Sequence, residues 1–171
     1  KNKGIKMITQ HRLKELMIYN KDTGIFTRTK TLNGTNGLKV GEKVDKKGYA
    51  FVTIDKKYYK LHRLAWLYCY GEFPNGQIDH INQIKTDNRI ENSRVDKDGC
   101  LNQSNKGKRK DCTSGFIGVN YNIDKQKWTA RLQFYGKRKD ICYKDTAYEC
   151  ALAREKYIIE NNLPHTRNFN D

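Results

Sequence analysis

Residues 77–82 read Gln-Ile-Asp-His-Ile-Asn, and residues 87–92 read Asp-Asn-Arg-Ile-Glu-Asn. The first stretch places a carboxylate, Asp79, beside an imidazole, His80, at the end of a short apolar run. The second stretch contains two asparagines, whose side chains are amides. Oxygen ligands of these kinds favour Mg²⁺, with Mn²⁺ as a substitute. An imidazole with an ordinary pKa near about 6.5 can take a proton from water. The sequence therefore predicts a hydrolytic site in which Asp79 binds the metal and His80 is the general base.

The charge distribution favours a polyanionic substrate. The 171 residues contain 34 Lys and Arg and 19 Asp and Glu, a formal net charge of +15. Residues 1–60 hold 15 basic and 5 acidic side chains, residues 61–100 hold 5 and 6, and residues 101–171 hold 14 and 8. Two basic flanks that can neutralise phosphates thus enclose a near-neutral segment that carries the carboxylate. We expect double-stranded DNA as the partner and no small-molecule substrate.

Cysteine usage and hydropathy exclude several classes of protein. The five cysteines include no Cys-x-x-Cys pair, so we expect free thiols in a reducing compartment and no structural zinc. No apolar run approaches the ~20 residues that span a bilayer. The basic N-terminal residues lack the apolar stretch of a signal peptide. The sequence predicts a cytoplasmic protein without a membrane partner.

Hydrophobic periodicity predicts the elements before the candidate site. Residues 9–18 have apolar side chains at helical spacing, and residues 19–27 have the pattern of a tight hairpin. Residues 29–48 indicate a basic loop. Strands at 49–54 and 58–61 and a buried helix at 62–70 complete this part.

The end of the chain predicts a small sheet packed on one helix. Strands are expected at 118–121, 127–134 and 137–143, and Thr146 with Glu149 forms a capping box for a helix through Ile159. Side chains alternate along the middle strand, so its apolar face should pack on the helix and its polar face should remain free. The apolar face comprises Trp128, Ala130, Leu132 and Phe134, and the polar face comprises Thr129, Arg131 and Gln133.

Five short stretches occur in an order typical of one family. They are Tyr-Asn-Lys-Asp-Thr-Gly-Ile-Phe (19–26), His-Arg-Leu-Ala-Trp (62–66), Gly-Glu-Phe-Pro (71–74) and the two stretches at 77–82 and 87–92. Through them, residues 8–110 resemble phage and intron-encoded HNH endonucleases. The resemblance implies a ββα-metal finger and cleavage of DNA to 5′-phosphate and 3′-hydroxyl ends. For a phage protein it implies the cytoplasm of a bacterial host.

The same resemblance implies roles for two asparagines. In this family a central Asn orients the general base through its ring nitrogen, and that position matches Asn92. A final His or Asn on the helix of the finger binds the metal, which matches Asn102, four residues after the expected N-cap at Asp98. Asn105 is the alternative ligand, because the segment before Asn102 is one residue longer than the family spacing.

A second resemblance covers residues 114–160. Ser-Gly-Phe-Ile-Gly-Val (114–119), Lys-Trp (127–128), Tyr-Gly-Lys-Arg (135–138) and Asp-Thr-Ala (145–147) are similar to the plant Apetala/ethylene-response-factor DNA-binding domain. The resemblance implies that the polar face of the sheet contacts DNA. The matching positions are Asn120, Arg131, Gln133 and Arg138. The preceding Lys-Gly-Lys-Arg-Lys run contains Lys108 and Arg109, and is either a solvated linker or a further phosphate contact.

These inferences combine into one expected protein of the α+β class. Its segments are a basic helix and hairpin region (1–60), an HNH ββα-metal core (61–106), a basic linker (107–113) and a three-stranded antiparallel sheet packed on one helix (114–171). Its expected function is metal-dependent cleavage of duplex DNA by a phage or homing endonuclease, by nicking or by double-strand cleavage. The alternatives are a non-catalytic DNA-binding protein with a degenerate finger, and a nuclease for branched DNA or RNA.

Overall fold

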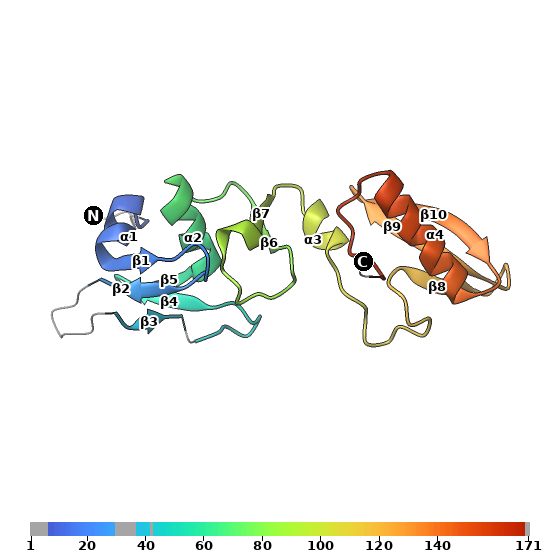
Figure 1. The fold of residues 1–171 in the computed structure, drawn as a ribbon, viewed down its shortest axis with the longest axis horizontal. Coiled ribbons are helices and arrows are strands. Elements are labelled where there is room, and N and C mark those ends of the chain that lie inside the picture. The colour runs from blue at the N-terminus through green and yellow to red at the C-terminus, as the bar shows by residue number, and fades with distance from the viewer. Residues whose placement is uncertain (1–6, 30–36, 42, 170–171) are drawn as a thin grey trace, which may run out of the picture. The chain divides into compact units, whose positions relative to one another are not determined.

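The computed structural model describes residues 7–29, 37–41 and 43–169, and its elements are shown in Figure 1. Residues 30–36 and 42 of the expected basic loop (29–48) lie outside the described residues, and its described part contains a short strand, β3 (Lys39–Val40), where no strand was expected. The fold is α+β with several antiparallel sheets, which confirms the expected class. The chain divides into two compact units, Lys1–Val95 and Asp96–Asp171.

The first unit begins with a short helix and a small sheet. Helix α1 (Gln10–Leu16) starts after Thr9, whose hydroxyl accepts a hydrogen bond from the Arg12 N–H. The chain then turns directly into β1 (Met17–Tyr19), so the expected helix over 9–18 is too long at its end. Strands β1, β2 (Phe26–Arg28) and β3 (Lys39–Val40) form an antiparallel sheet in that order. The expected hairpin after α1 is confirmed.

A second hairpin leads into the central helix of this unit. Strands β4 (Phe51–Ile54) and β5 (Lys57–Lys60) pair around a two-residue turn, and α2 (Leu61–Tyr70) follows without a break. Gly71 ends α2 with a φ of 85°, a left-handed cap that glycine adopts at little cost. The expected strands at 49–54 and 58–61 and the expected helix are therefore confirmed.

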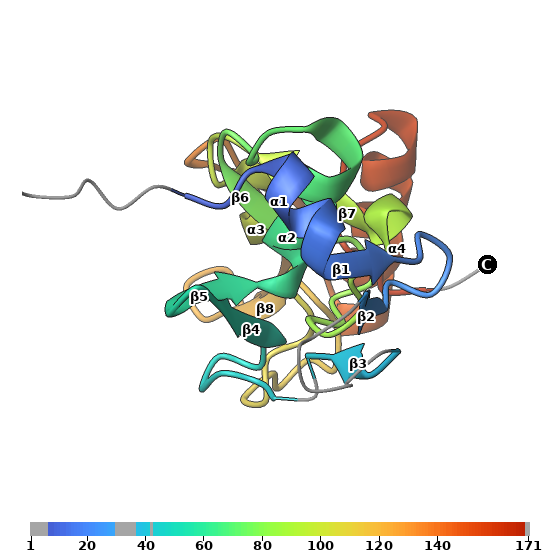
Figure 2. The same ribbon diagram turned by 90° about the vertical axis from the view of Figure 1, so that its left-hand side faces the viewer.

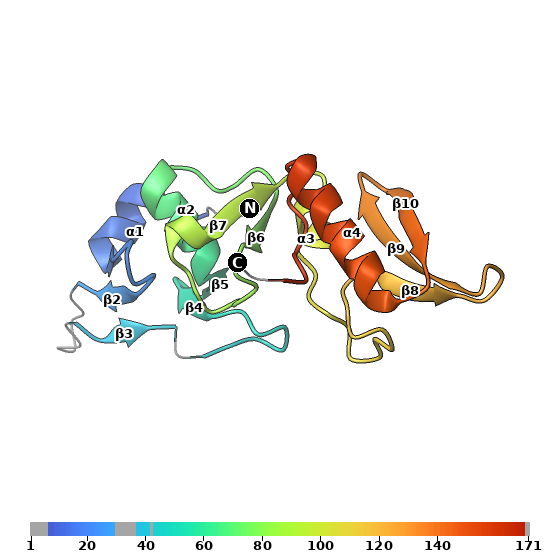
Figure 3. The same cartoon turned by 45° about the vertical axis from the view of Figure 1, so that its right-hand side comes forward.

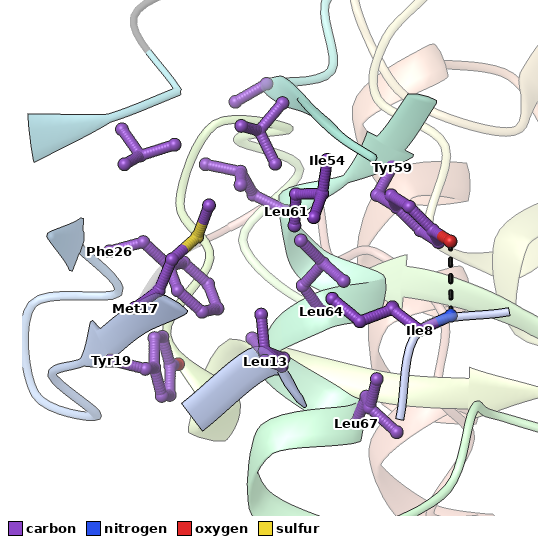
Figure 4. Close-up of a cluster of buried hydrophobic side chains, with 14 residues drawn as sticks. Ile8, Leu13, Met17, Tyr19, Phe26, Ile54, Tyr59, Leu61, Leu64 and Leu67 are labelled. Atoms are coloured by element: carbon purple, nitrogen blue, oxygen red, sulfur yellow. Dashed lines mark hydrogen bonds between the residues drawn. The ribbon is translucent and has the colours of Figure 1, made fainter. Parts of the chain in front are cut away.

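One hydrophobic core joins these elements. Leu13, Phe26 and Leu64 have no exposed surface, and they pack with side chains from β1, β4, β5 and α2 (Figure 4). The Ile8 N–H donates to the Tyr59 hydroxyl at 3.2 Å in the same cluster. Helix α1 packs against α2 (Figure 2). The N-terminal elements and α2 thus share a core, whereas the sequence placed a segment boundary at residue 60.

The candidate finger follows α2. Strand β6 (Gln77–His80) pairs with β7 (Ser93–Asp96), and the short 3-10 helix η1 (Ile90–Asn92) lies just before β7. Helix α3 (Cys100–Ser104) comes next, which is the ββα order expected for the finger. Because the two units divide at residues 95 and 96, the boundary falls inside the stretch 61–106.

The second unit is a sheet backed by a helix. Strands β8 (Val119–Asn122), β9 (Lys127–Phe134) and β10 (Lys137–Lys144) form an antiparallel sheet with β9 in the middle, and α4 (Ala147–Glu160) packs on it (Figure 3). The Thr146–Glu149 capping box is present as expected. Val119, Ala130, Cys150 and Ala151 form the buried centre of this unit. The predicted packing of the apolar sheet face on the helix is confirmed.

No helix in residues 7–29, 37–41 or 43–169 has the length and apolar character needed for a membrane span.

Candidate active site

Strand β6 ends with Asp79 and His80, and the side chains of both are buried in the first unit. Asp79 is 6% exposed and His80 is 4% exposed, so both polar side chains leave water on folding. A buried carboxylate requires a partner. Asp79 has one in Arg94 on the paired strand β7, whose Nε and Nη2 each lie 2.8 Å from the same oxygen, Oδ2. The charge of Asp79 is therefore held in place by a forked contact to a single oxygen.

His80 lies among aromatic rings. The ring centroid of His62 is 5.0 Å away in an edge-on arrangement, and that of Tyr49 is 5.8 Å away. Burial lowers the pKa of His80, although the charges of Asp79 and Asp87 oppose the shift. Burial also lowers the pKa of His62, to about 3. Both imidazoles are neutral at pH 7, and a neutral His80 can accept a proton from water.

Asn92 fixes the loop between His80 and β7. Its side-chain Oδ1 accepts from the Asn82 N–H at 2.9 Å, and its Nδ2 donates to the Asp87 carbonyl at 3.0 Å. Its own carbonyl accepts from the Ile81 N–H at 2.9 Å. The expected contact with the ring of His80 is replaced by these three contacts to the loop. Asn92 therefore shapes the chain that leaves His80 through these hydrogen bonds.

Asp87 is the charged centre of the same loop. Its carboxylate accepts from Arg89 Nε and Nη2 and from Asn82 Nδ2, at 2.7–2.9 Å. The hydrogen bond from the Arg89 side chain lowers the pKa of Asp87 to about 2. The ionised form thus stabilises the folded loop at every pH above the ordinary range for an aspartate.

We expect Asp87→Asn to lower the free energy of unfolding at pH 7 by about 1–2 kcal/mol, because charge-assisted hydrogen bonds are lost. Since the pKa of Asp87 is lowered on folding, its contribution is complete above about pH 4 and disappears as the pH falls toward about 2. Urea unfolding at pH 7 and pH 3 measures both effects. The exposed Asp22→Asn in the same unit is the control and should change neither curve. A constant difference between wild type and Asp87→Asn across this pH range would contradict the assignment.

Of the two candidate amide ligands, Asn102 lies on α3 and Asn105 directly follows its last residue, both in the second unit. The backbone N–H and Nδ2 of Asn102 both donate to Asp96 Oδ2 at 2.7 Å. Helix α3 begins after Gly99, so the expected N-cap at Asp98 is wrong, and the Asp96 carboxylate accepts the N–H groups at this end instead. No donor in the described part of the chain contacts Asn102 Oδ1, the atom that a cation would bind. Oδ1 of Asn105, the alternative ligand, accepts from Thr166 at 3.4 Å.

Two lysines lie near His80 that the sequence did not single out. Lys60 Nζ lies 4.0 Å from the centroid of the Tyr49 ring, and Lys85 Nζ lies 5.2 Å from it. Lys85 also donates to the Lys47 carbonyl at 2.9 Å. Both cations disfavour a proton on His80. The two lysines on the Tyr49 ring thus place positive charge beside the imidazole, where it can stabilise the charge of a phosphate.

Sequence reasoning missed Arg94, Tyr49, Lys60 and Lys85. For Arg94 a signal existed, because a cation on the second strand of a hairpin can pair with a carboxylate on the first. The register of β6 and β7 was needed to choose Asp79 as its partner. The lysines and Tyr49 come from the β4–β5 hairpin and the loop after β6, and only the tertiary fold brings those segments together.

The six residues predicted to contact DNA line one hollow of about 530 Å³ in the second unit. Two of these residues are bound by Asp140 on β10, whose carboxylate accepts from Arg131 Nε at 3.0 Å and lies 3.5 Å from Arg138 Nε. The hydrogen bond from Tyr143 and the two arginines lower the pKa of Asp140, so it stays ionised and orients both cations. The residues brought together are Asn120, Arg131, Gln133, Arg138, Lys108 and Arg109.

One part of the predicted polar face is wrong. Thr129 has no exposed surface, although it shares the face of Arg131 and Gln133. It lies in the central strand, opposite Asn120 on β8 and Tyr143 on β10. Side chains directly opposite each other on one sheet face are close neighbours, so Asn120 and Tyr143 cover the shorter Thr129.

Among residues 7–29, 37–41 and 43–169, no group of three or more His, Cys, Asp or Glu side chains is arranged to hold a metal ion. Asp79 is the carboxylate at the centre of the site just described.

Comparison with known protein families singles out the same region. Residues 59–95 match the HNH endonuclease family model. The match runs from β5 to the end of the first unit and contains His62, Asp79, His80, Asn92 and Arg94. It supports an HNH-type nuclease whose substrate is DNA. No curated protein and no solved structure matches the chain.

Proposed function

We propose that this protein is a metal-dependent HNH endonuclease of the phage or homing type, which hydrolyses phosphodiester bonds of duplex DNA in the cytoplasm of its host. The observation that carries the proposal is the position of His80. It is a buried, neutral imidazole beside a carboxylate, inside the segment that matches the HNH endonuclease model. A neutral imidazole next to cations is suited to activate water against a phosphate.

In the proposed reaction His80 takes the proton from the attacking water. The loop held by Asn92 and Asp87 fixes the direction in which the chain leaves the imidazole, and Lys60 and Lys85 attract the phosphate. Attack at phosphorus breaks the bond to the 3′ oxygen, which leaves a 5′-phosphate and a 3′-hydroxyl end. The six predicted DNA-contact residues among those that line the hollow of the second unit provide further DNA contacts.

The donor set fits a hard divalent cation such as Mg²⁺ or Mn²⁺. Asp79 would hold it through its carboxylate. In the second unit, Asn102 stays the predicted amide ligand, and Asp96 orients its Oδ1 by binding the other end of the amide. Asn102 fits better than Asn105, whose Oδ1 already accepts a hydrogen bond from Thr166. When bound, such a cation polarises a phosphoryl oxygen and stabilises the leaving group.

The Asp79–Arg94 ion pair favours a second candidate function. A guanidinium can neutralise a carboxylate that would otherwise bind a cation. A chain in which Arg94 has taken the place of the metal would bind DNA without cutting it. This is the non-catalytic alternative.

Supercoiled plasmid separates the two functions. With Mg²⁺ we expect open-circle or linear DNA, and with EDTA we expect the supercoiled form to persist, since cleavage needs the cation. Mn²⁺ should restore cleavage. DNA ligase should reseal the nicks, because the ends carry a 5′-phosphate and a 3′-hydroxyl. A protein that retards DNA on a gel but leaves it intact with Mg²⁺ and with Mn²⁺ is the non-catalytic alternative.

A further inference from the structure

The hollow of the second unit is strongly basic. It lies against the segment after α3, the start of β8 and parts of β9, and its cationic lining residues are Lys106, Lys108, Arg109, Arg131, Arg138 and Arg154. Asp111 is an acidic lining residue, and it is already bound to Arg109, with an Oδ2–Nη2 distance of 2.7 Å. The local charge therefore favours an anion in this hollow.

Arg154 is the cation that needs a ligand most. Only 3% of it is exposed, and burial lowers its pKa to about 10. Its Nη1 donates to the Thr166 carbonyl at 3.0 Å, but its Nε has no hydrogen-bond partner in the described part of the chain. The adjacent carboxylate of Glu155 is bound to Arg167 and to the Asn168 N–H. A buried cationic donor without an acceptor is costly, so an oxyanion here would remove a penalty of folding.

Gly118 makes room for this guanidinium. A Cβ at Gly118 would lie 2.7 Å from Arg154 Nε and 2.7 Å from the Arg131 carbonyl. The φ of Gly118 is +71°, a conformation that side-chain-bearing residues rarely adopt. Gly118 and Arg154 both line the hollow, so the start of β8 lets the guanidinium approach a part of the chain that any other residue would block.

His165 adds a second buried polar group to the same lining. It is 7% exposed, its Nε2 lies 3.1 Å from the Gln133 carbonyl, and its Nδ1 has no partner among the described residues. Apolar side chains of Phe116, Ile117 and Leu132 complete one part of the wall. A volume of about 530 Å³ is larger than a lone oxyanion requires and lies in the range of small-molecule sites.

We propose that this hollow binds one nucleotide, with its phosphate on Arg154. The exposed cations Lys108 and Arg138 contact the same phosphate or the next one, and the apolar wall contacts the sugar or base. The nucleotide has two possible sources, a DNA strand and a free nucleotide in solution. For a DNA strand, the proposal rests on the proposed function. It assigns Arg154 and His165 to ligand binding. The sequence predicted a DNA contact for neither of them.

Calorimetric titration of the full chain in EDTA tests the proposal, with dTMP, inorganic phosphate and a short duplex as separate probes. We expect saturable binding of dTMP or of duplex, and weakening by at least about tenfold in Arg154→Met. Lys156→Met is the matched control, because Lys156 lies on the same helix with a side chain that is 75% exposed. This control should bind as the wild type does.

The probes also identify the source. Weakened binding of duplex alone assigns the nucleotide to a DNA strand, whereas dTMP binding that duplex does not displace assigns it to a free nucleotide. Absence of saturable binding of dTMP and duplex to the wild type overturns the proposal, as does equal binding by Arg154→Met.

If Arg154→Met does not fold, a Lys108→Met/Arg138→Met double variant replaces it in the test. Both of these side chains are exposed, so their replacement should not disturb folding. Undiminished binding by that variant likewise overturns the proposal. Since EDTA prevents metal-dependent cleavage, the result is independent of nuclease activity. If binding depends on Arg154 but the protein never cuts plasmid, the proposed nuclease function is wrong and the proposed nucleotide site stands.

Discussion

Replacing His80 by alanine should lower the rate of plasmid cleavage by roughly 100- to 10,000-fold, the usual contribution of a positioned general base. The imidazole is 4% exposed, and burial lowers its pKa, which favours the basic form at neutral pH. Neither ring near it offers a substitute. The pKa of His62 is about 3, so it is too weak a base, and burial raises the pKa of Tyr49. Single-turnover cleavage of supercoiled plasmid with Mg²⁺ measures the loss.

His11→Ala is the matched control for this substitution. His11 lies on α1 with a side chain that is 86% exposed, and its Nδ1 lies 3.3 Å from Glu15. Among the described residues its side chain pairs with Glu15, outside the candidate site, so its replacement should leave the cleavage rate unchanged. Circular dichroism and urea unfolding should show that His80→Ala is folded. A folded His80→Ala protein that cuts at the wild-type rate would remove His80 from the mechanism.

The elements that the sequence predicted correctly are those with a strong local signal. The capping box at Thr146 and Glu149, the alternation along β9, and the turn from Tyr19 to Phe26 each depend on neighbours within a few residues. The short helix α3 was placed one residue too early. Its first N–H groups bind the side chain of Asp96, which precedes the helix by several residues, and not a capping side chain next to it. A local rule for N-caps cannot anticipate that arrangement.

The candidate site was predictable in its residues but not in its contacts. Asp79 and His80 were named from their sequence alone, yet the Arg94 partner of Asp79 depends on how β6 pairs with β7. Asn92 was assigned to the imidazole by resemblance, whereas its side chain binds the loop. Thr129 was assigned to an open face by alternation, which says which face a side chain shares but not how large its neighbours are.

The loop after His80 depends on a glycine far away in sequence. A Cβ at Gly24, in the turn between β1 and β2, would lie 2.5 Å from the Arg89 nitrogen and 2.7 Å from the Asn88 carbonyl carbon. These are backbone atoms, which cannot move aside as a flexible side chain can. The Tyr19 hydroxyl on the adjoining strand donates to the Asn88 carbonyl at 2.7 Å. The N-terminal hairpin thus supports the segment that carries Asp87 and Asn92.

We therefore expect Gly24→Ala to lower the free energy of unfolding of the first unit by roughly 2–5 kcal/mol, which combines the cost of a left-handed alanine with that of overpacking. Gly37→Ala separates the two causes. Gly37 has a φ of +72°, close to the +69° of Gly24, but a Cβ there meets nothing within 4 Å. It should cost only about 1–2 kcal/mol, the backbone part alone. Urea unfolding of both variants measures the difference.

Cleavage assays on the two variants extend the test from stability to function. If contact with residues 88 and 89 holds the loop in place, Gly24→Ala should slow plasmid cleavage even at temperatures where the variant remains folded, and Gly37→Ala should not. Equal unfolding energies for the two variants would mean that the cost lies in the backbone conformation alone. The turn from Asn20 to Ile25 would then have no part in placing the loop, and the position of Asn92 would depend on its own hydrogen bonds to Asn82 and Asp87.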